Sequence, residues 1–279
     1  PTVFNADNEF RVGYRTIWNR GNVDIPVQTN NGLFTGANRT NWFNALFGAE
    51  SNGTTPTSNA LYRAGQYFRR NDANGPWGPQ ATAQQFQCRQ NFTILTTDGY
   101  RNQGALAEPN EGNASPSAFP IGNDDGTPGA VITRPDGASY QYTPVAPYTD
   151  GWTDTLADVA MGFWKNDLRP DLTNIVPTSS SNPAFWQHMV TFGISIGLRG
   201  TLDPETALPG LTDGTVNWPE PLNLQPSSID DLWHATVNGR GTFVAAADPE
   251  ELSNGLGAAL RAISERRGSG SNASVSSTS

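Results

Sequence analysis

Hydrophobic and polar positions along this chain follow two periods, which predict strands interleaved with helices. Residues 9–18 alternate β-branched and aromatic side chains with polar ones, which is typical of a half-buried strand. Residues 92–95 form a short apolar run within a predicted strand of residues 92–97, and residues 185–198 end in a nearly continuous one, as expected of a strand buried on both faces. Residues 242–246 form the last predicted strand.

Apolar residues recur at helical spacing in several segments between these strands. Those segments are residues 39–47, 57–70, 153–164 and 229–234. The final helix has the clearest start, because Asp248 is a good N-cap, Pro249 suits the first helical position and Glu251 completes a capping box. Strands that alternate with helices over this length predict an α/β fold, in which a mostly parallel sheet is flanked by helices on both faces.

Two stretches without a clear period interrupt this pattern. Residues 71–90 are rich in Gly, Pro and Gln, whereas residues 101–150 are dense in Gly, Pro, Asn and Asp and contain a hairpin predicted over residues 131–142. A loop as long as the second is usually functional or mobile inside a compact domain. We therefore predict one elaborated domain over residues 1–267 with these two loop insertions, followed by a flexible Gly/Ser-rich linker over residues 268–279.

Composition and motifs narrow the function. The net charge of −9 argues against a nucleic-acid footprint, which would need a basic face. No run of about 18 apolar residues occurs, so we expect no direct membrane span. The sequence contains no nucleophile elbow, HExxH motif, P-loop or dinucleotide fingerprint. We therefore predict that the chain is not an enzyme and has no catalytic or cofactor-binding residues.

Two candidate metal ligands lie at the end of one strand and the start of one helix. Asp98 follows the strand of residues 92–97, and open α/β folds bind their ligands at the carboxyl ends of strands. Thr55 lies just before the helix of residues 57–70. A hydroxyl and a carboxylate in these places can converge on one hard cation, which takes oxygen ligands.

Both residues also have a simpler interpretation. Asp98 precedes Gly99 and could serve only to form a turn. Thr55 could satisfy backbone donors at the helix entrance, and Thr54 or Thr57 could be the ligating position instead.

Other residues with potential chemistry are predicted to be structural. The Asn-Asp-Asp-Gly stretch at residues 123–126 lacks the spaced acidic ligands and closing Glu of an EF-hand, which favours a polar turn over a calcium loop. His188 and His234 have no Cys or Asp signature beside them. Cys88 has no partner within the chain, so we predict a buried or half-buried thiol, or a disulfide to a segment outside this sequence.

Several segments spread through the chain carry a resemblance to a known family. They are residues 10–17, 88–100, 154–161, 164–169, 185–192, 231–235 and 248–252. Together and in this order they resemble the N-terminal region of the PilC/PilY family, the tip and biogenesis adhesins of bacterial type IV pili. The resemblance implies a von Willebrand factor A-like (Rossmann-like) domain, which in that family precedes a large C-terminal β-propeller.

The resemblance also gives Thr55 and Asp98 a role. They match positions of the metal-ion-dependent adhesion site of von Willebrand A domains, whose remaining ligands come from an Asp-x-Ser-x-Ser loop after the first core strand. No such loop occurs here, so we expect the first strand and helix to lie outside this chain. Mg²⁺ and Ca²⁺ each take about six or more oxygens, so we expect either ion in the intact domain and weak or no binding here.

The function implied by the resemblance is a non-enzymatic binding module at the bacterial cell surface and pilus tip, reached through the periplasm and outer membrane. It would act in pilus assembly, twitching motility, surface adhesion and surface sensing. Its expected partners are minor pilins or other tip subunits, the protein's own β-propeller, and a ligand on a host or abiotic surface. The alternative is a structural linker that docks minor pilins and carries a vestigial metal site.

Overall fold

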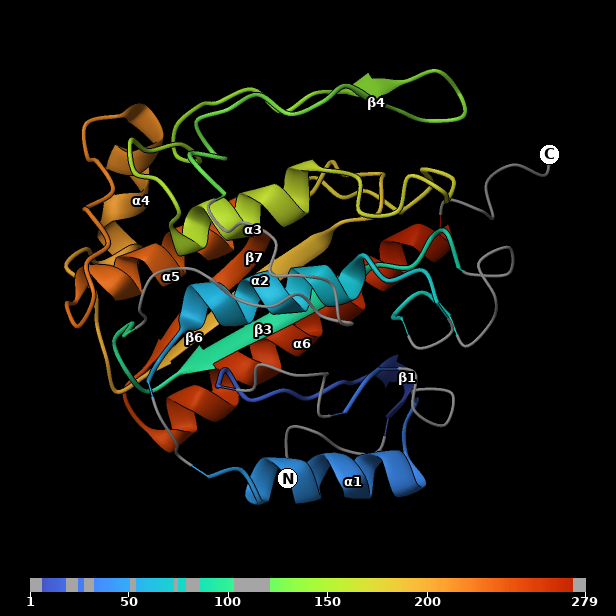
Figure 1. Cartoon of the computed structure of the whole chain (residues 1–279), viewed down its shortest axis with the longest axis horizontal. Helices are drawn as coiled ribbons and strands as arrows, with labels where there is room; N and C mark the ends of the chain where they lie inside the picture. The colour runs from blue at the N-terminus through green and yellow to red at the C-terminus, as the bar shows by residue number, and fades with distance from the viewer. Residues whose placement is uncertain are drawn as a thin grey trace. The chain divides into compact units, whose positions relative to one another are not determined.

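The computed structural model falls into two units, each of which is described by itself (Figure 1). The first unit comprises residues 1–86 and 102–120, and the second comprises residues 87–101 and 121–279. The structure describes residues 7–18, 25–27, 33–50, 54–72, 75–78, 86–102 and 121–272.

The first unit contains a small antiparallel sheet and two helices. Strand β1 (Asp7–Arg11) pairs with β2 (Leu33–Phe34), and helices α1 (Gly36–Phe47) and α2 (Thr57–Phe68) follow. Both helices confirm the sequence prediction. The predicted strand of residues 9–18 is shorter than expected, because β1 ends at Arg11 and the next pairing is an isolated bridge between Tyr14 and Ile25.

The second unit is built on a parallel sheet of three strands among the described residues. Its order is β3 (Asn91–Thr97), β6 (Met189–Ile196) and β7 (Arg240–Ala246), and both pairings are parallel. The central strand β6 is buried almost throughout, as its continuous apolar run predicts. The mixed α/β fold is therefore confirmed, and its parallel sheet is consistent with a Rossmann-like von Willebrand A arrangement.

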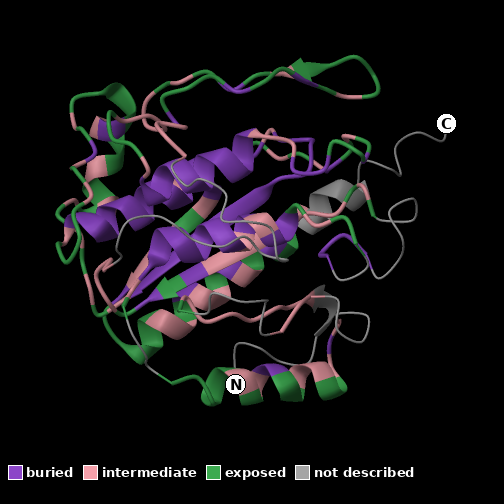
Figure 2. Ribbon diagram, in the orientation of Figure 1, coloured by how far each residue is buried: buried purple, intermediate pink, exposed green. Residues whose placement is uncertain are grey.

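Helices cover both faces of this sheet. They are α3 (Leu156–Lys165), α5 (Ser227–Asn238) and α6 (Pro249–Asn272), whereas α4 (Pro204–Asp213) packs with Trp233 of α5 through Leu211. Gly193 of β6 lies against Leu232 and Thr236 of α5, whereas its neighbour Phe192 lies under Arg266 of α6. Successive residues of a strand point to opposite faces, so α5 and α6 flank opposite sides of the sheet. Figure 2 shows that α3 is buried along its whole length.

The close contact at Gly193 leads to a testable prediction. A Cβ atom there would lie 2.7 Å from Thr236 Cγ2 and 3.0 Å from Leu232 Cδ1. We expect Gly193→Ala to lower the free energy of unfolding by about 1–3 kcal/mol through overpacking, as measured by urea denaturation. Gly257→Ala is the control, because its Cβ would meet only Arg261, at 3.4 Å. Alanine is more favourable than glycine in a helix by about 1 kcal/mol, so we expect no loss of stability there. Equal losses in both variants would contradict this explanation.

The start of α6 agrees with the predicted N-cap at Asp248. Asp248 Oδ1 accepts hydrogen bonds from the backbone N–H groups of Glu250 and Glu251 at the start of α6, and the Glu251 carboxylate accepts one from Ala247. Helix α6 continues to Asn272, into the segment predicted as a linker from Gly268. The predicted limits of domain and linker otherwise remain predictions. No helix in the described part of the chain has the length and apolar character that a membrane span needs.

The insertion of residues 101–150 contains ordered structure in its second half. The predicted hairpin is confirmed as β4 (Ile132–Thr133) paired with β5 (Ser139–Tyr140). Tyr142 is 2 % exposed and Asp125 is 0 % exposed, so this half contributes to the core. Cys88 lies in the described part of the other insertion, and its side chain is exposed. The prediction of a buried or half-buried thiol is therefore wrong.

Candidate functional site

Asp98 lies at the carboxyl end of β3, as predicted. The Thr97 hydroxyl donates to the Gly99 carbonyl at 2.9 Å and accepts from the Gly99 N–H at 3.2 Å, which turns the chain and leaves Asp98 exposed. Thr55 belongs to the other unit, where its backbone N–H and carbonyl pair with Asn102 at 3.1 and 3.0 Å. The two candidate ligands thus lie in different units, and their shared metal site stays a prediction.

The segment after β3 is fixed to the start of α5. The Arg101 N–H donates to the Ser228 hydroxyl at 3.2 Å, and Arg101 Nη1 lies 3.2 Å from Asp231 Oδ2. The Asp231 carboxylate also accepts from the N–H groups of Leu156 and Ala157, each at 3.0 Å. A helix N-terminus attracts anions, but here the start of α3 is satisfied by the protein's own carboxylate.

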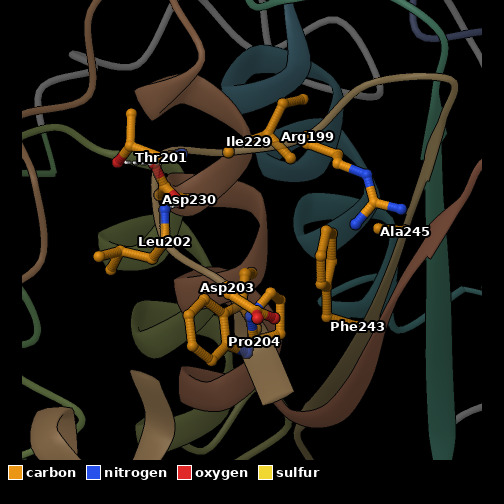
Figure 3. Close-up of a pocket in the computed structure, with 11 residues that line it drawn as sticks. Arg199, Thr201, Leu202, Asp203, Pro204, Ile229, Asp230, Phe243 and Ala245 are labelled. Atoms are coloured by element: carbon orange, nitrogen blue, oxygen red, sulfur yellow. Dashed lines mark hydrogen bonds between the residues drawn. The ribbon is translucent and has the colours of Figure 1, made fainter. Parts of the chain in front are cut away.

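A cavity of about 220 Å³ lies beside this edge of the sheet (Figure 3). It is formed by the loop after β6, by α5 and by β7, with Trp233 and Phe243 among its lining residues. Asp230 holds the loop in place, because its Oδ2 accepts from the Thr201 N–H at 2.8 Å and from the Thr201 hydroxyl at 2.7 Å. Figure 3 shows the Arg199 side chain near Phe243. Besides its apolar walls the cavity has one cation, Arg199, and two carboxylates, Asp203 and Asp230, so its lining favours no single charge in a ligand.

A buried polar cluster of the second unit joins the 121–150 segment to α5. His234 Nδ1 lies 3.3 Å from Asp150 Oδ2, and His234 Nε2 lies 3.7 Å from Asp125 Oδ2 and 3.0 Å from the Tyr148 carbonyl oxygen. The His234 ring stacks on Trp218, with centroids 4.1 Å apart and planes at 11°. One ligand atom from each of Asp125, Asp150 and His234 lies within 4.8 Å of the others, so these three residues could hold a metal ion.

Neighbouring groups orient this cluster. Asp125 Oδ1 accepts from the Asp150 N–H at 3.1 Å, and Asp125 Oδ2 accepts from Asn238 Nδ2 at 3.0 Å. Burial raises the pKa of Asp125 to about 7, although the nearby His234 opposes the shift. Burial also raises the pKa of Asp158 to about 6, against hydrogen bonds from Thr155 and from the Asp124 and Asp125 backbone.

Sequence reasoning missed this cluster. The turn of residues 123–126 does form, with Asn123 Oδ1 accepting from Gly126, but its third residue, Asp125, is buried instead of solvated. His188 and His234 are both buried, as expected of structural histidines. The cluster joins distant segments and follows no local motif. The usable signals were the histidine in the predicted helix of residues 229–234 and the acidic residues of the long insertion.

Comparisons with known proteins point to one family of relatives. No model of a known protein family matches the chain, and no solved structure matches it. The chain is 36 % identical over 247 residues to the "Type IV pilus biogenesis factor PilY1" of Pseudomonas aeruginosa strain PAO1, covering 78 % of this chain and 20 % of that protein. For strain UCBPP-PA14 the identity is 31 % over 276 residues, covering 89 % of this chain and 22 % of PilY1.

The chain is homologous to a segment of PilY1. PilY1 of a third strain, PAK, agrees, with 34 % identity over 247 residues. The match confirms the type IV pilus resemblance at the level of homology to PilY1, while the von Willebrand A assignment stays a prediction. The chain spans 20–22 % of the length of these PilY1 relatives.

Proposed function

We propose that this chain is the part of a PilY1-like protein that acts in type IV pilus biogenesis as a non-enzymatic binding module. The observation that carries this proposal is the 31–36 % identity to PilY1 over 78–89 % of the chain. Its partners would be minor pilins or other tip subunits, together with a further domain of the same protein. It would act on the cell surface or at the pilus tip, in assembly, adhesion and surface sensing.

The exposed end of the parallel sheet is the binding face that we favour. Asp98 is exposed there, and Arg199 and Asp203 are exposed at the nearby cavity. Ligands of open α/β sheets bind at the carboxyl ends of the strands, so this placement supports a contact surface by fold analogy. In the intact domain, Thr55 and Asp98 would help to hold Mg²⁺ or Ca²⁺, and a carboxylate of the ligand would complete the coordination shell.

The alternative function is a structural linker with a vestigial metal site. Internal hydrogen bonds favour this alternative. The Asp230 carboxylate accepts from N–H groups of the loop after β6, and the Asp231 carboxylate accepts from N–H groups at the start of α3. A surface whose donors are satisfied internally suits packing against a neighbouring subunit better than capture of an anion.

Asp98→Ala in the full-length protein of the source bacterium separates the two functions. For an adhesion-type metal site we expect attachment to a surface in Mg²⁺ to fall at least about tenfold, since even groups that only orient metal ligands change metal affinity by about 10–100-fold. The amount of sheared surface pili should stay unchanged. Asp136→Ala is the control, because Asp136 is exposed in the β4–β5 turn.

Each other outcome has a defined meaning. Unchanged attachment, with or without a chelator of divalent ions, would refute the metal role and favour the linker. A strain that lacks the segment of residues 1–267 tests the role in biogenesis itself, and we expect it to lose its surface pili. Normal piliation and twitching in that strain would refute the proposed function.

A further inference from the structure

The buried cluster of Asp125, Asp150 and His234 has no role in the proposed binding face. It joins an insertion to α5, and its members come from a turn, a loop and a helix. Each of them is enclosed, with side-chain exposures of 0 %, 7 % and 2 %. The hydrogen-bond partners of the His234 imidazole indicate that a positively charged species is missing beside Nδ1.

One nitrogen of His234 is already committed. Nε2 lies 3.0 Å from the Tyr148 carbonyl oxygen, which can only accept, so Nε2 carries the proton and donates. In the neutral ring Nδ1 then carries a lone pair, and it faces Asp150 Oδ2 at 3.3 Å. A lone pair and a carboxylate oxygen repel each other unless a positive species lies between them.

The spacing of His234 Nδ1 and Asp150 Oδ2 suits a metal ion between them, and Asp125, Asp150 and His234 each place one ligand atom within 4.8 Å of the others. Zinc binds His nitrogen and Asp oxygen at about 2.0–2.1 Å in tetrahedral geometry, which sets neighbouring ligand atoms about 3.3 Å apart. The Nδ1–Oδ2 separation of 3.3 Å matches that spacing. A metal-bound imidazole usually donates its other N–H to a backbone carbonyl or carboxylate, as Nε2 does to Tyr148 here.

Asp125 and Asn238 complete the surroundings. Both Asp125 oxygens are oriented by donors, the Asp150 N–H at 3.1 Å and Asn238 Nδ2 at 3.0 Å. Asn238 is 0 % exposed, and its Oδ1 has no hydrogen-bond partner among the described residues, so an unused buried acceptor lies beside the cluster. Asp150 and Asp158 are the acidic neighbours of Asp125, so carboxyl groups outnumber the one imidazole around this cluster.

We propose that Asp125, Asp150 and His234 bind one zinc ion. The ion would neutralise the two carboxylates and tie the 121–150 segment to α5, and it would act as a structural site independent of the predicted site at Thr55 and Asp98. Zinc is preferred because it accepts a mixed nitrogen and oxygen set of few ligands. Mg²⁺ and Ca²⁺ need about six or more oxygens.

Zinc titration of the chelator-stripped chain tests this inference. The full chain is used without a histidine tag and in a Cys88→Ser background, because an exposed thiol binds zinc. We expect one equivalent to bind in calorimetry and to raise the melting temperature by several degrees. Asp150→Asn and His234→Gln should each weaken zinc binding at least about 100-fold, since even indirect ligand partners change affinity about 10–100-fold. Asp98→Asn should leave it unchanged.

A second measurement keeps the test decisive if these variants do not fold. Co²⁺ added to the stripped Cys88→Ser chain should give the intense visible absorption of tetrahedral cobalt, which zinc then abolishes. The absence of saturable zinc binding would overturn the proposal and leave a proton between His234 and Asp150. Zinc binding that both variants retain would overturn it as well.

Discussion

Replacing Asp231 with alanine is expected to lower the free energy of unfolding of the second unit by about 3–5 kcal/mol, the cost of removing one member of a buried ion pair. The Asp231 carboxylate accepts from the N–H groups of Leu156 and Ala157 and lies 3.2 Å from Arg101 Nη1. Without it, two donors at the start of α3 lose their acceptor and the guanidinium of Arg101 loses its counter-ion. Urea denaturation followed by tryptophan fluorescence measures the change.

Two variants show whether burial is the cause. Asp231→Asn keeps an acceptor for α3 and removes the charge, so we expect an intermediate loss. Asp136→Ala removes an ion pair to Arg134 whose side chains are 62 % and 38 % exposed, and such surface pairs contribute under about 1 kcal/mol. If Asp231→Ala cost as little as Asp136→Ala, the carboxylate would not hold α3 and α5 together.

The sheet was predictable because its signals are local. A short apolar run over residues 92–95, and a continuous one that reaches Ile196, mark strands whatever surrounds them. Helix α4 was missed although Asp203-Pro204-Glu205 repeats the start signal of α6. Pro209 lies inside α4 and breaks the expected pattern, and the helix is still formed because Leu211 packs with Trp218 and Trp233.

The candidate sites divide in the same way. Asp98 could be located because a strand and a turn specify it within a few residues. The cluster of Asp125, Asp150 and His234 could not, because an insertion must fold back on α5 before these side chains meet. Asp125 also lies in a polar turn, and only the tertiary structure encloses its carboxylate. Tertiary packing, not local propensity, therefore decides which acidic residues of this insertion carry chemistry.

Lowering the pH from 6.5 to 4 is expected to destabilise the second unit through His188. Burial lowers the pKa of His188 to about 4 from its ordinary 6.5, and the nearby Arg266 and Arg240 lower it further. His188 Nδ1 donates to the Trp186 carbonyl at 2.7 Å, and Asn182 Nδ2 donates to Nε2 at 2.8 Å, so the enclosed ring is neutral. Below pH 6.5, His188 of the unfolded chain binds a proton, whereas the enclosed ring of the folded protein stays neutral.

The stability supplied by neutral His188 is thus present above pH 6.5 and is lost as the pH falls toward 4, in total roughly 3 kcal/mol. His188→Gln should be less stable at pH 7 but should lack this acid-dependent loss, as measured by urea denaturation at several pH values with a chelator present. Gly193→Ala is a matched control that is destabilised by packing and keeps the histidine, so its pH dependence should equal that of the unaltered chain. If His188→Gln kept the full acid dependence, the loss of stability at low pH would arise from the protonation of other groups and not of His188.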